Sequence, residues 1–285
     1  MNKFLPLFIF IFTALNAQNQ RFIYEYRFII DSTDRSNVEK ELTVLDVTSK
    51  GSEFYSYQKF KMDSLASIDA EKQQFDDSDI INTKHIYRGK INYTVSKIYP
   101  SFETYFKTFM GSNEYKVSDD RKPVWKILPE KEKIGEFHTQ KAETEIFGRK
   151  WTAWFTAEIP IQDGPYKFQG LPGLILKLSD KNETHAFELK GIAKIPEKQK
   201  LKTDPRIIAP TEVVINQKQF QKLYVELRND PGKTLRELLN QNEAVKVIGE
   251  DGKEVDIAEI LRKRETQGKE LRAKNNNILE LDMIK

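Results

Sequence analysis

The side chains that most often bind metals or carry catalysis are few in this chain and lie far apart. The chain has no cysteine and three histidines, His85, His138 and His185, none of which begins an H-E-x-x-H motif or a similar metal-binding face. It therefore has no thiolate for a metal site and no cysteine nucleophile. We expect no metal and no cofactor, and we interpret each histidine as a side chain of a strand.

Carboxylates are plentiful and leave one hydrolytic chemistry open. Glu158 and Asp163 lie close together in the sequence, and paired carboxylates serve as acid and base in glycoside hydrolysis. An Asp or Glu acting with Tyr166 or His138 is a related possibility. The favoured interpretation is plainer: Glu158 is a surface charge, and Asp163 is a turn residue before glycine. The chain has no G-x-S-x-G elbow, phosphate-binding loop or G-x-G-x-x-G fingerprint.

The most unusual stretch runs from Lys150 to Asp180 and is rich in aromatic residues. Trp151, Ala153 and Phe155 alternate with Thr152 and Trp154, so both faces of a predicted strand carry aromatic rings. The Trp154 face is therefore either covered by another element or part of a groove. Further along, the segment Tyr166-Lys167-Phe168-Gln169 places two rings on one side. We predict that this region binds a ligand through Trp154, Tyr166, Phe168 and Gln169.

Turn residues frame the aromatic segment on both sides. One turn is predicted at Asp163-Gly164-Pro165, and another at Leu171-Pro172-Gly173-Leu174. The second has Pro at its second position and Gly at its third, the pattern of a type II turn with a positive φ at the glycine. Gly170 adds another position that tolerates positive φ.

These residues resemble a known family. The string Gly170-Leu171-Pro172-Gly173-Leu174-Ile175 is similar to the signature of the bacterial GLPGLI family, and the blocks WTAW, EIPI and DGPYKF are similar to the context of that signature. The resemblance extends over most of the chain after residue 17. It implies an exported, β-rich protein of Gram-negative bacteria. The family has no established biochemical role, so no catalytic residue is carried over.

The hydrophobic period indicates a mainly β fold of the α+β class. Short runs of β-branched and aromatic residues with tight connections predict a curved antiparallel sheet, meander-like or half-barrel-like. After Pro210 the period changes to that of helices: one capped by Asn216, one beginning at Asp230-Pro231, and one from Val255 to about Ala273. A short helix is predicted from Asp63 to Phe75. The predicted strands are Arg21–Ile30, Leu42–Thr48, Glu53–Phe60, Ile80–Tyr87, Ile91–Tyr99, Phe102–Phe109, Lys122–Leu128, Phe137–Phe147, Lys150–Ala157, Leu174–Leu178 and His185–Gly191.

The N-terminus predicts export. Lys3 precedes an apolar run from Phe4 to Phe12, and Ala17 supplies the small residue at which a secretory signal is cut. The run is too short for a membrane anchor. We therefore expect a signal peptide over residues 1–17, a β-rich region over 18–210 with the GLPGLI motif, and a helical region over 211–285. The mature protein would be periplasmic or secreted and would not span a membrane.

Three functions remain open. The leading hypothesis is a non-enzymatic envelope protein that binds a peptide, a lipid or a partner protein through the aromatic region of residues 154–175. The alternatives are an exported hydrolase with a carboxylate-based site and a structural or assembly protein. The formal charge of +3, from 46 Lys and Arg against 43 Asp and Glu, gives no basic patch for nucleic acid.

Overall fold

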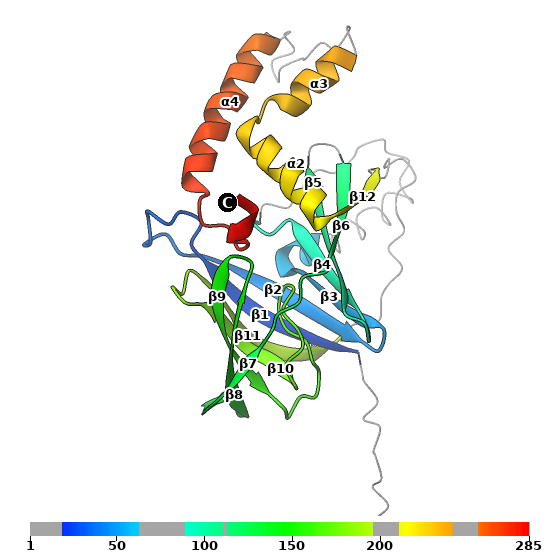
Figure 1. The fold of residues 1–285 in the computed structure, drawn as a ribbon, viewed down its shortest axis with the longest axis vertical. Helices are drawn as coiled ribbons and strands as arrows, with labels where there is room; N and C mark the ends of the chain where they lie inside the picture. Colours follow the sequence, from blue (N-terminus) through cyan, green and yellow to red (C-terminus); the bar gives the residue numbers. More distant parts are fainter. Residues whose placement is uncertain (1–18, 63–88, 111–112, 196–210, 242–255, 285) are drawn as a thin grey trace, which may run out of the picture.

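A computed structural model describes residues 19–62, 89–110, 113–195, 211–241 and 256–284. In these residues one sheet of twelve strands runs in the order β12-β6-β5-β4-β3-β2-β1-β11-β10-β9-β8-β7 (Figure 1). The strands are β1 Gln20–Phe28, β2 Glu39–Thr48, β3 Gly51–Ser56, β4 Tyr93–Ile98, β5 Glu103–Met110, β6 Asn113–Asp119, β7 Lys126–Ile134, β8 Phe137–Ile146, β9 Arg149–Thr156, β10 Leu174–Asp180, β11 His185–Lys194 and β12 Glu212–Asn216.

The sheet is mixed, which corrects one detail of the sequence-based prediction. Along the sheet from β6, the second strand in this order, to β7 at the far edge, each neighbouring pair is antiparallel, as the short connections predicted. Of the described strands, only β12 pairs in parallel, with β6. The run Glu-Val-Val-Ile-Asn of β12 comes directly before the helix cap Asn216 and falls within the region predicted to be helical. Local turn signals cannot reveal a strand whose partner lies about a hundred residues earlier.

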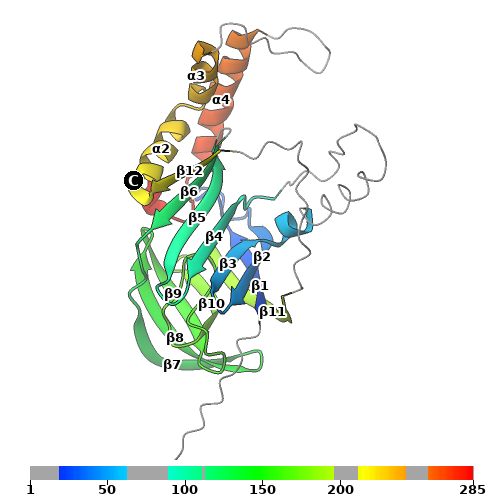
Figure 2. The ribbon, with the colours of Figure 1, turned by 90° about the vertical axis from the view of Figure 1, so that its right-hand side faces the viewer.

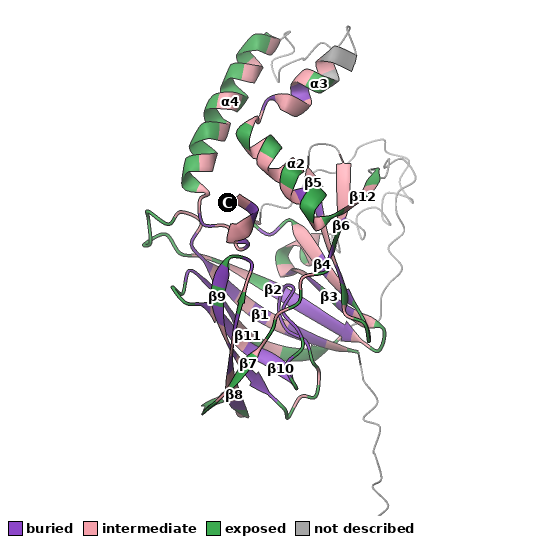
Figure 3. Cartoon of the chain, in the orientation of Figure 1, coloured by how far each residue is buried: buried purple, intermediate pink, exposed green. Residues whose placement is uncertain are grey.

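The sheet curves strongly and so has a hollow side (Figure 2), and the buried residues of its strands form one core with those of the connection between β9 and β10 (Figure 3 colours the buried residues). The connection between β9 and β10, residues 157–173, crosses this hollow; we call it the inner loop. The Tyr166 ring of the inner loop lies 6.4 Å from Phe54 of β3, 5.5 Å from Tyr93 of β4 and 6.4 Å from Phe106 of β5. Because these strands lie across the sheet from β9 and β10, the inner loop fills the centre of the half-barrel.

The helices extend beyond one end of the sheet (Figures 1 and 2). They are α2 Gln217–Asn229, α3 Lys233–Gln241 and α4 Ile257–Lys274, followed by the short 3-10 helix η2 Leu281–Ile284. Asn216 caps α2 as predicted, and its side chain and that of Gln219 form a capping box. The second helix was predicted to start at Pro231, but α3 begins at Lys233 after a turn. None of the described helices has the length and hydropathy to cross a membrane.

Two further boundaries differ from the prediction, and one strand was missed. Residues 57–62 are helical rather than a continuation of β3, β7 extends to Ile134 where the prediction stopped at Leu128, and β6 was not predicted. The strand predicted at Ile80–Tyr87 and the helix at Asp63–Phe75 lie outside the described residues. The division into regions at residue 210 stays a prediction.

Candidate functional site

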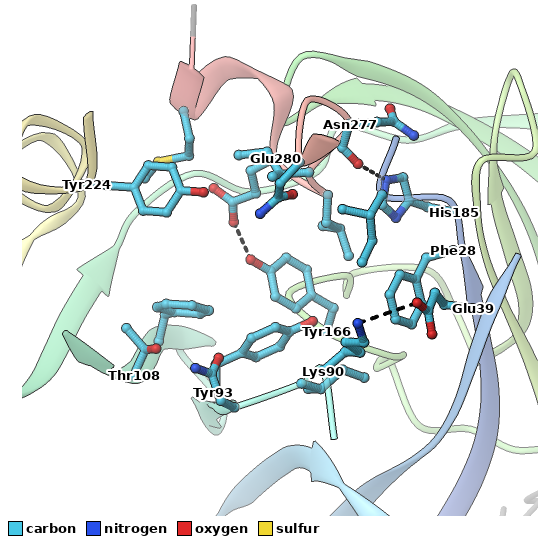
Figure 4. Close-up of a pocket in the computed structure, with 18 of the residues that line it drawn as sticks. Phe28, Glu39, Lys90, Tyr93, Thr108, Tyr166, His185, Tyr224, Asn277 and Glu280 are labelled. Atoms are coloured by element: carbon cyan, nitrogen blue, oxygen red, sulfur yellow. Dashed lines mark hydrogen bonds and ion pairs between the residues drawn. The ribbon is translucent and has the colours of Figure 1, made fainter. Parts of the chain in front are cut away.

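A cavity of about 790 Å³ lies between the hollow side of the sheet, α2, the end of α4 and the chain that follows it (Figure 4). We call residues 275–284, which return from α4 to the sheet, the C-terminal segment. The side of the cavity that faces the sheet is formed by β1, β4, β5 and the inner loop. Its lining includes Tyr26, Phe28, Tyr93, Phe106, Thr108, Tyr166, Lys167, His185, Phe220, Tyr224, Leu271, Lys274, Asn277, Ile278, Leu279, Glu280 and Met283.

Aromatic rings form much of the inner wall. Phe106 of β5 lies 5.1 Å from the ring of Tyr93 and 5.6 Å from Phe220 of α2, and Phe220 lies 6.3 Å from Tyr224. Tyr166 of the inner loop packs against both Tyr93 and Phe106. Rings at these separations pack favourably edge to face or tilted, so they form one aromatic wall.

A cluster of charges lies beside these rings, and we call Asp119, Arg121, Lys167 and Glu280 the tail cluster; all but the partly exposed Arg121 are buried. The Lys167 ammonium donates to Asp119 Oδ2 at 2.7 Å and to Glu280 Oε1 at 2.5 Å, and Tyr166 OH donates to the same Glu280 oxygen at 2.5 Å. Arg121 binds the other oxygen of Glu280 at 2.6 Å and also binds Asp119. Lys167 lies 4.9 Å from the centre of the Phe106 ring, a cation–π distance.

The electrostatics of the tail cluster keep its carboxylates ionised. Burial alone would raise the pKa of Asp119, but hydrogen bonds and charge from Arg121 and Lys167 outweigh it and lower the pKa to about 2. The pKa of Glu280 is also lowered, because Lys167 and Arg121 outweigh the effect of its burial. Burial and the charge of Glu280 raise the pKa of Tyr166, so its hydroxyl stays a donor.

Arg149 of β9 attaches the C-terminal segment to the sheet. Its guanidinium donates to Asn277 Oδ1 at 2.7 Å, to the Ile278 carbonyl at 2.6 Å and to the Leu279 carbonyl at 3.0 Å. It also binds Asp180 of β10 at 3.0 Å, with both side chains almost fully buried. One arginine thus joins two strands to three successive residues of the segment.

His185 makes a second attachment. Its Nε2 lies 2.8 Å from the Asn277 carbonyl, and its Nδ1 lies 2.6 Å from Tyr26 OH. Donation by Nε2 to the carbonyl leaves Nδ1 to accept from the tyrosine, which is the pattern of a neutral imidazole. Burial, assisted by the positive charge of Arg149, lowers the pKa of His185 to about 4.

Of the four predicted binding residues, Tyr166 alone lines the cavity. Phe168 is fully buried against Trp151, with ring centres 4.8 Å apart. Gln169 is buried, and its carbonyl accepts from the Trp125 indole at 2.7 Å. Trp154 is half-buried on the other face of β9, level with Lys141 and Lys177 of the neighbouring strands. The structure therefore does not bring the four side chains together.

The predicted turn residues anchor the inner loop. Asp163 is fully buried and pairs with the equally buried Lys97 of β4, while Tyr99 OH also donates to its carboxylate. Lys97 donates in addition to the carbonyls of Gly164 at 2.9 Å and Phe168 at 3.3 Å. One lysine thus fixes the inner loop from Asp163 to Phe168 to the sheet. We call the pair of Lys97 and Asp163 the base anchor.

The type II turn predicted at Leu171–Leu174 is wrong. Gly173 N–H donates to the Leu171 carbonyl at 2.7 Å, closing a tighter turn around Pro172, and Leu174 N–H goes instead to the Ile159 carbonyl. Gly173 has φ +152°, and a Cβ there would lie 2.0 Å from the Thr156 carbonyl oxygen. Gly173 is therefore needed for a close backbone approach as well as for its conformation. Gly170 takes positive φ, +92°, as predicted.

The acid pair considered for hydrolysis does not form a site. Asp163 is held in the base anchor, whereas Glu158 is exposed and accepts from His138 on β8. His138 is exposed and His185 buried, both in strands as predicted, and His85 lies outside the described residues. The described part of the chain contains no group of three or more His, Asp or Glu arranged to hold a metal ion.

Sequence reasoning missed Asp119, Lys167 and Glu280. Lys167 carried a weak signal, because a lysine between two aromatic residues in a stiff loop is a candidate for burial with a partner. Glu280 carried none, since its partners lie more than a hundred residues away.

Comparisons with known proteins find one similar family and no activity. Residues 104–177, a minority of the chain, are similar to a family described as "Protein of unknown function (Porph_ging)". This agrees with the expectation of a family without an established function, although it does not bear the GLPGLI name. No curated protein matches the chain.

Two solved structures of PNGF-II, in the P21 and C2 space groups, are similar to the chain at 16% sequence identity and a TM-score of 0.47. They cover 73% and 74% of this chain. The chain spans about a third of their length, 33% and 34% respectively.

Proposed function

We propose that this chain is an exported protein that binds an apolar small molecule in the cavity and does not transform it. The observation that carries the proposal is a cavity of about 790 Å³ lined by aromatic rings, beside which the buried charges are already paired with one another. This volume lies within the range of ligand pockets, which are mostly apolar with a few polar groups.

The pairing of the charges favours an apolar ligand over an ionic one. Both oxygens of Glu280 and the ammonium of Lys167 already have partners in the tail cluster. A charged ligand at the inner wall would have to break these bonds while losing its own hydration, and burial of an unpaired charge is expensive. An apolar ligand gains from leaving water and disturbs nothing.

The inner loop has a different role in this proposal from the one its sequence indicated. Tyr166 contributes to the wall of the cavity, whereas Phe168 and Gln169 support it from within the core. Export rests on the sequence of residues 1–17, which lie outside the described residues.

A carboxylate-based hydrolase is less well supported. The pairing of Glu280 with Tyr166 is a carboxylate and a tyrosine at the cavity wall, as that hypothesis requires. A general acid needs a raised pKa, but the pKa of Glu280 is lowered. Both of its oxygens also accept hydrogen bonds already, Oε1 from Tyr166 and Lys167 and Oε2 from Arg121, so three of its roughly four acceptor sites are taken.

A cavity-filling substitution tests the proposal. We expect the chain from residue 18 onward to bind the uncharged apolar dye N-phenyl-1-naphthylamine with an increase in fluorescence. Thr108→Phe places a ring in the cavity and should weaken binding about tenfold or more, equivalent to about 1.4 kcal/mol. Thr94→Phe on the adjacent strand, outside the cavity lining, is the matched control and should bind like the parent. Equal binding by all three proteins would rule out the cavity as the site.

A further inference from the structure

We infer that the ligand is a single-chain amphiphile with a carboxylate or a similar hydrogen-bond-accepting head, held with its chain at the inner wall and its head at the mouth. This inference rests on the proposed function and assigns the class and orientation of the molecule bound there. It follows from the uneven distribution of apolar and polar side chains along the cavity.

The inner end of the cavity offers apolar surface. Phe106, Tyr166 and Phe220 lie there with Met283 of η2, and Phe220 and Met283 belong to one buried cluster with Val117. The charged atoms behind them are engaged in the tail cluster. An alkyl chain meets this wall without leaving a polar group unpaired.

The mouth differs in composition. Lining residues there come from the connection between β1 and β2, the start of β2, the chain before β4 and the last turn of α4. Most are charged or amides: Asp31, Asp34, Asn37, Glu39, Lys90, Asn92 and Lys274. Lys90 pairs with Glu39 at 3.4 Å, while Asp31 and Asp34 accept hydrogen bonds from Thr33 and Ser36 (Figure 4 shows the Lys90–Glu39 pair).

Lys274 is the mouth cation available to a head group. Within the described residues it forms no ion pair, and its charge acts on Asp31 only at a distance. Leu271, one helical turn earlier, also lines the cavity and is 67% exposed. Apolar surface thus continues to the opening on the same helix face that presents the ammonium. An amphiphile that lies with its chain past Leu271 and its head at Lys274 matches both groups.

Two single-tryptophan additions measure the orientation. Phe106→Trp places a reporter at the inner wall, and Leu271→Trp places one at the mouth. The native Trp125, Trp151 and Trp154 do not line the cavity and supply a constant background, which the parent protein measures. The probes are two dodecanoates, one brominated at the terminal carbon and one next to the carboxylate, because bromine quenches tryptophan only at short range.

The expected result is reciprocal loss of fluorescence. Terminal bromine should quench the Phe106→Trp protein more than the Leu271→Trp protein, and bromine beside the carboxylate should do the reverse. The opposite order, or equal quenching of both reporters by both probes, would overturn the orientation. Displacement of the naphthylamine dye by unlabelled dodecanoate, measured in the same samples, keeps the two proposals apart: without dye binding the proposed function fails, and dye binding without displacement overturns only this inference.

Lys274→Gln tests the head group. The variant should bind dodecanoate more weakly than the parent while binding the uncharged dye equally well. Arg262→Gln, a change on the same helix outside the cavity lining, is the control. Unchanged affinity for dodecanoate in Lys274→Gln would overturn the pairing of the head with this lysine.

Discussion

Two buried lysines hold the inner loop, and they differ in what surrounds them. Lys97 reaches from β4 to Asp163 in the first half of the loop, with both side chains fully buried. Lys167 reaches from the loop itself to Asp119 and Glu280, at the wall of a cavity and against the C-terminal segment. The base anchor joins β4 to the inner loop, whereas the tail cluster joins the inner loop and β6 to the far end of the chain.

This difference indicates that the base anchor serves folding, whereas the tail cluster also serves binding. Removal of one partner from a sealed pair leaves a buried charge that nothing else can neutralise. In the tail cluster each charged group has more than one partner, so the loss of one leaves the others paired. Substitutions at the base anchor should therefore lower only the stability of the fold. Substitutions at the tail cluster should lower stability and also weaken binding in the cavity.

The largest effect is expected at the base anchor. Lys97→Met leaves Asp163 buried without its cation and should lower the free energy of unfolding by about 3–5 kcal/mol. Urea denaturation measures the change. The control is Lys107→Met on the neighbouring strand, which removes a half-exposed pair with Glu212 and should cost less than about 1 kcal/mol. Similar costs for the two variants would contradict the distinction between sealed and exposed pairs.

The attachment of the C-terminal segment should respond to pH. The folded protein lowers the pKa of His185 from 6.5 to about 4, so on acidification the unfolded chain takes up the proton first. This contribution to stability is complete above about pH 6.5 and is lost as the pH falls towards 4, by about 3 kcal/mol in total.

Urea denaturation between pH 7 and pH 4.5 tests this dependence. His185→Gln should flatten the slope over that window, whereas His138→Gln, at a side chain 83% exposed, should leave it as in the parent. A parent protein equally stable at pH 7 and pH 4.5 would show that His185 is not held neutral.

A smaller effect is expected inside the tail cluster. Glu280→Gln removes one charge but leaves Lys167 its bond to Asp119, so the cost should be that of a hydrogen bond to a charged group, about 1.5–3 kcal/mol. The same variant should weaken binding of the naphthylamine dye, which Lys97→Met should not do at temperatures where it is folded. Glu226→Gln, an exposed partner of Lys233, is the control. Normal dye binding by Glu280→Gln would remove the link between the tail cluster and the cavity.

The smallest effect is expected where the inner loop rejoins β10. Gly173→Ala forces a Cβ towards the Thr156 carbonyl at a positive φ and should destabilise by about 1–3 kcal/mol. Gly191→Ala meets no atom within 4 Å and should change stability by less than about 0.5 kcal/mol. Thermal unfolding of the two variants decides whether the close approach is real.

Most features that depend on residues close together in the sequence were predicted correctly. Trp151, Ala153 and Phe155 are buried while Thr152 and Trp154 are half-buried, as the alternation along β9 indicated. Asn216 caps α2 because its side chain reaches the Gln219 N–H three residues later. Such signals lie within a few residues, and they located most strands and the final helices.

Elements with few apolar residues or distant partners escaped prediction. The edge strand β7 carries Pro129 and a run of charges, which an edge tolerates because one side of it makes no ladder hydrogen bonds. The aromatic residues of the inner loop looked like a binding surface because sequence alone cannot tell a ring that lines a cavity, as Tyr166 does, from one packed behind it, as Phe168 is. Glu280 had no pattern around it at all.

The position of β1 bears on how the protein is made. This first strand lies in the middle of the sheet, where it pairs with β2 on one side and β11 on the other, so that Phe28 lies opposite His185. During synthesis β1 and β2 emerge early, but the second edge of β1 stays unpaired until β11 has been made. Closure over so long a separation is slow, and an open strand edge can pair with other chains in the meantime. Nascent or newly released chains should therefore depend on protection from aggregation until their last strands are available.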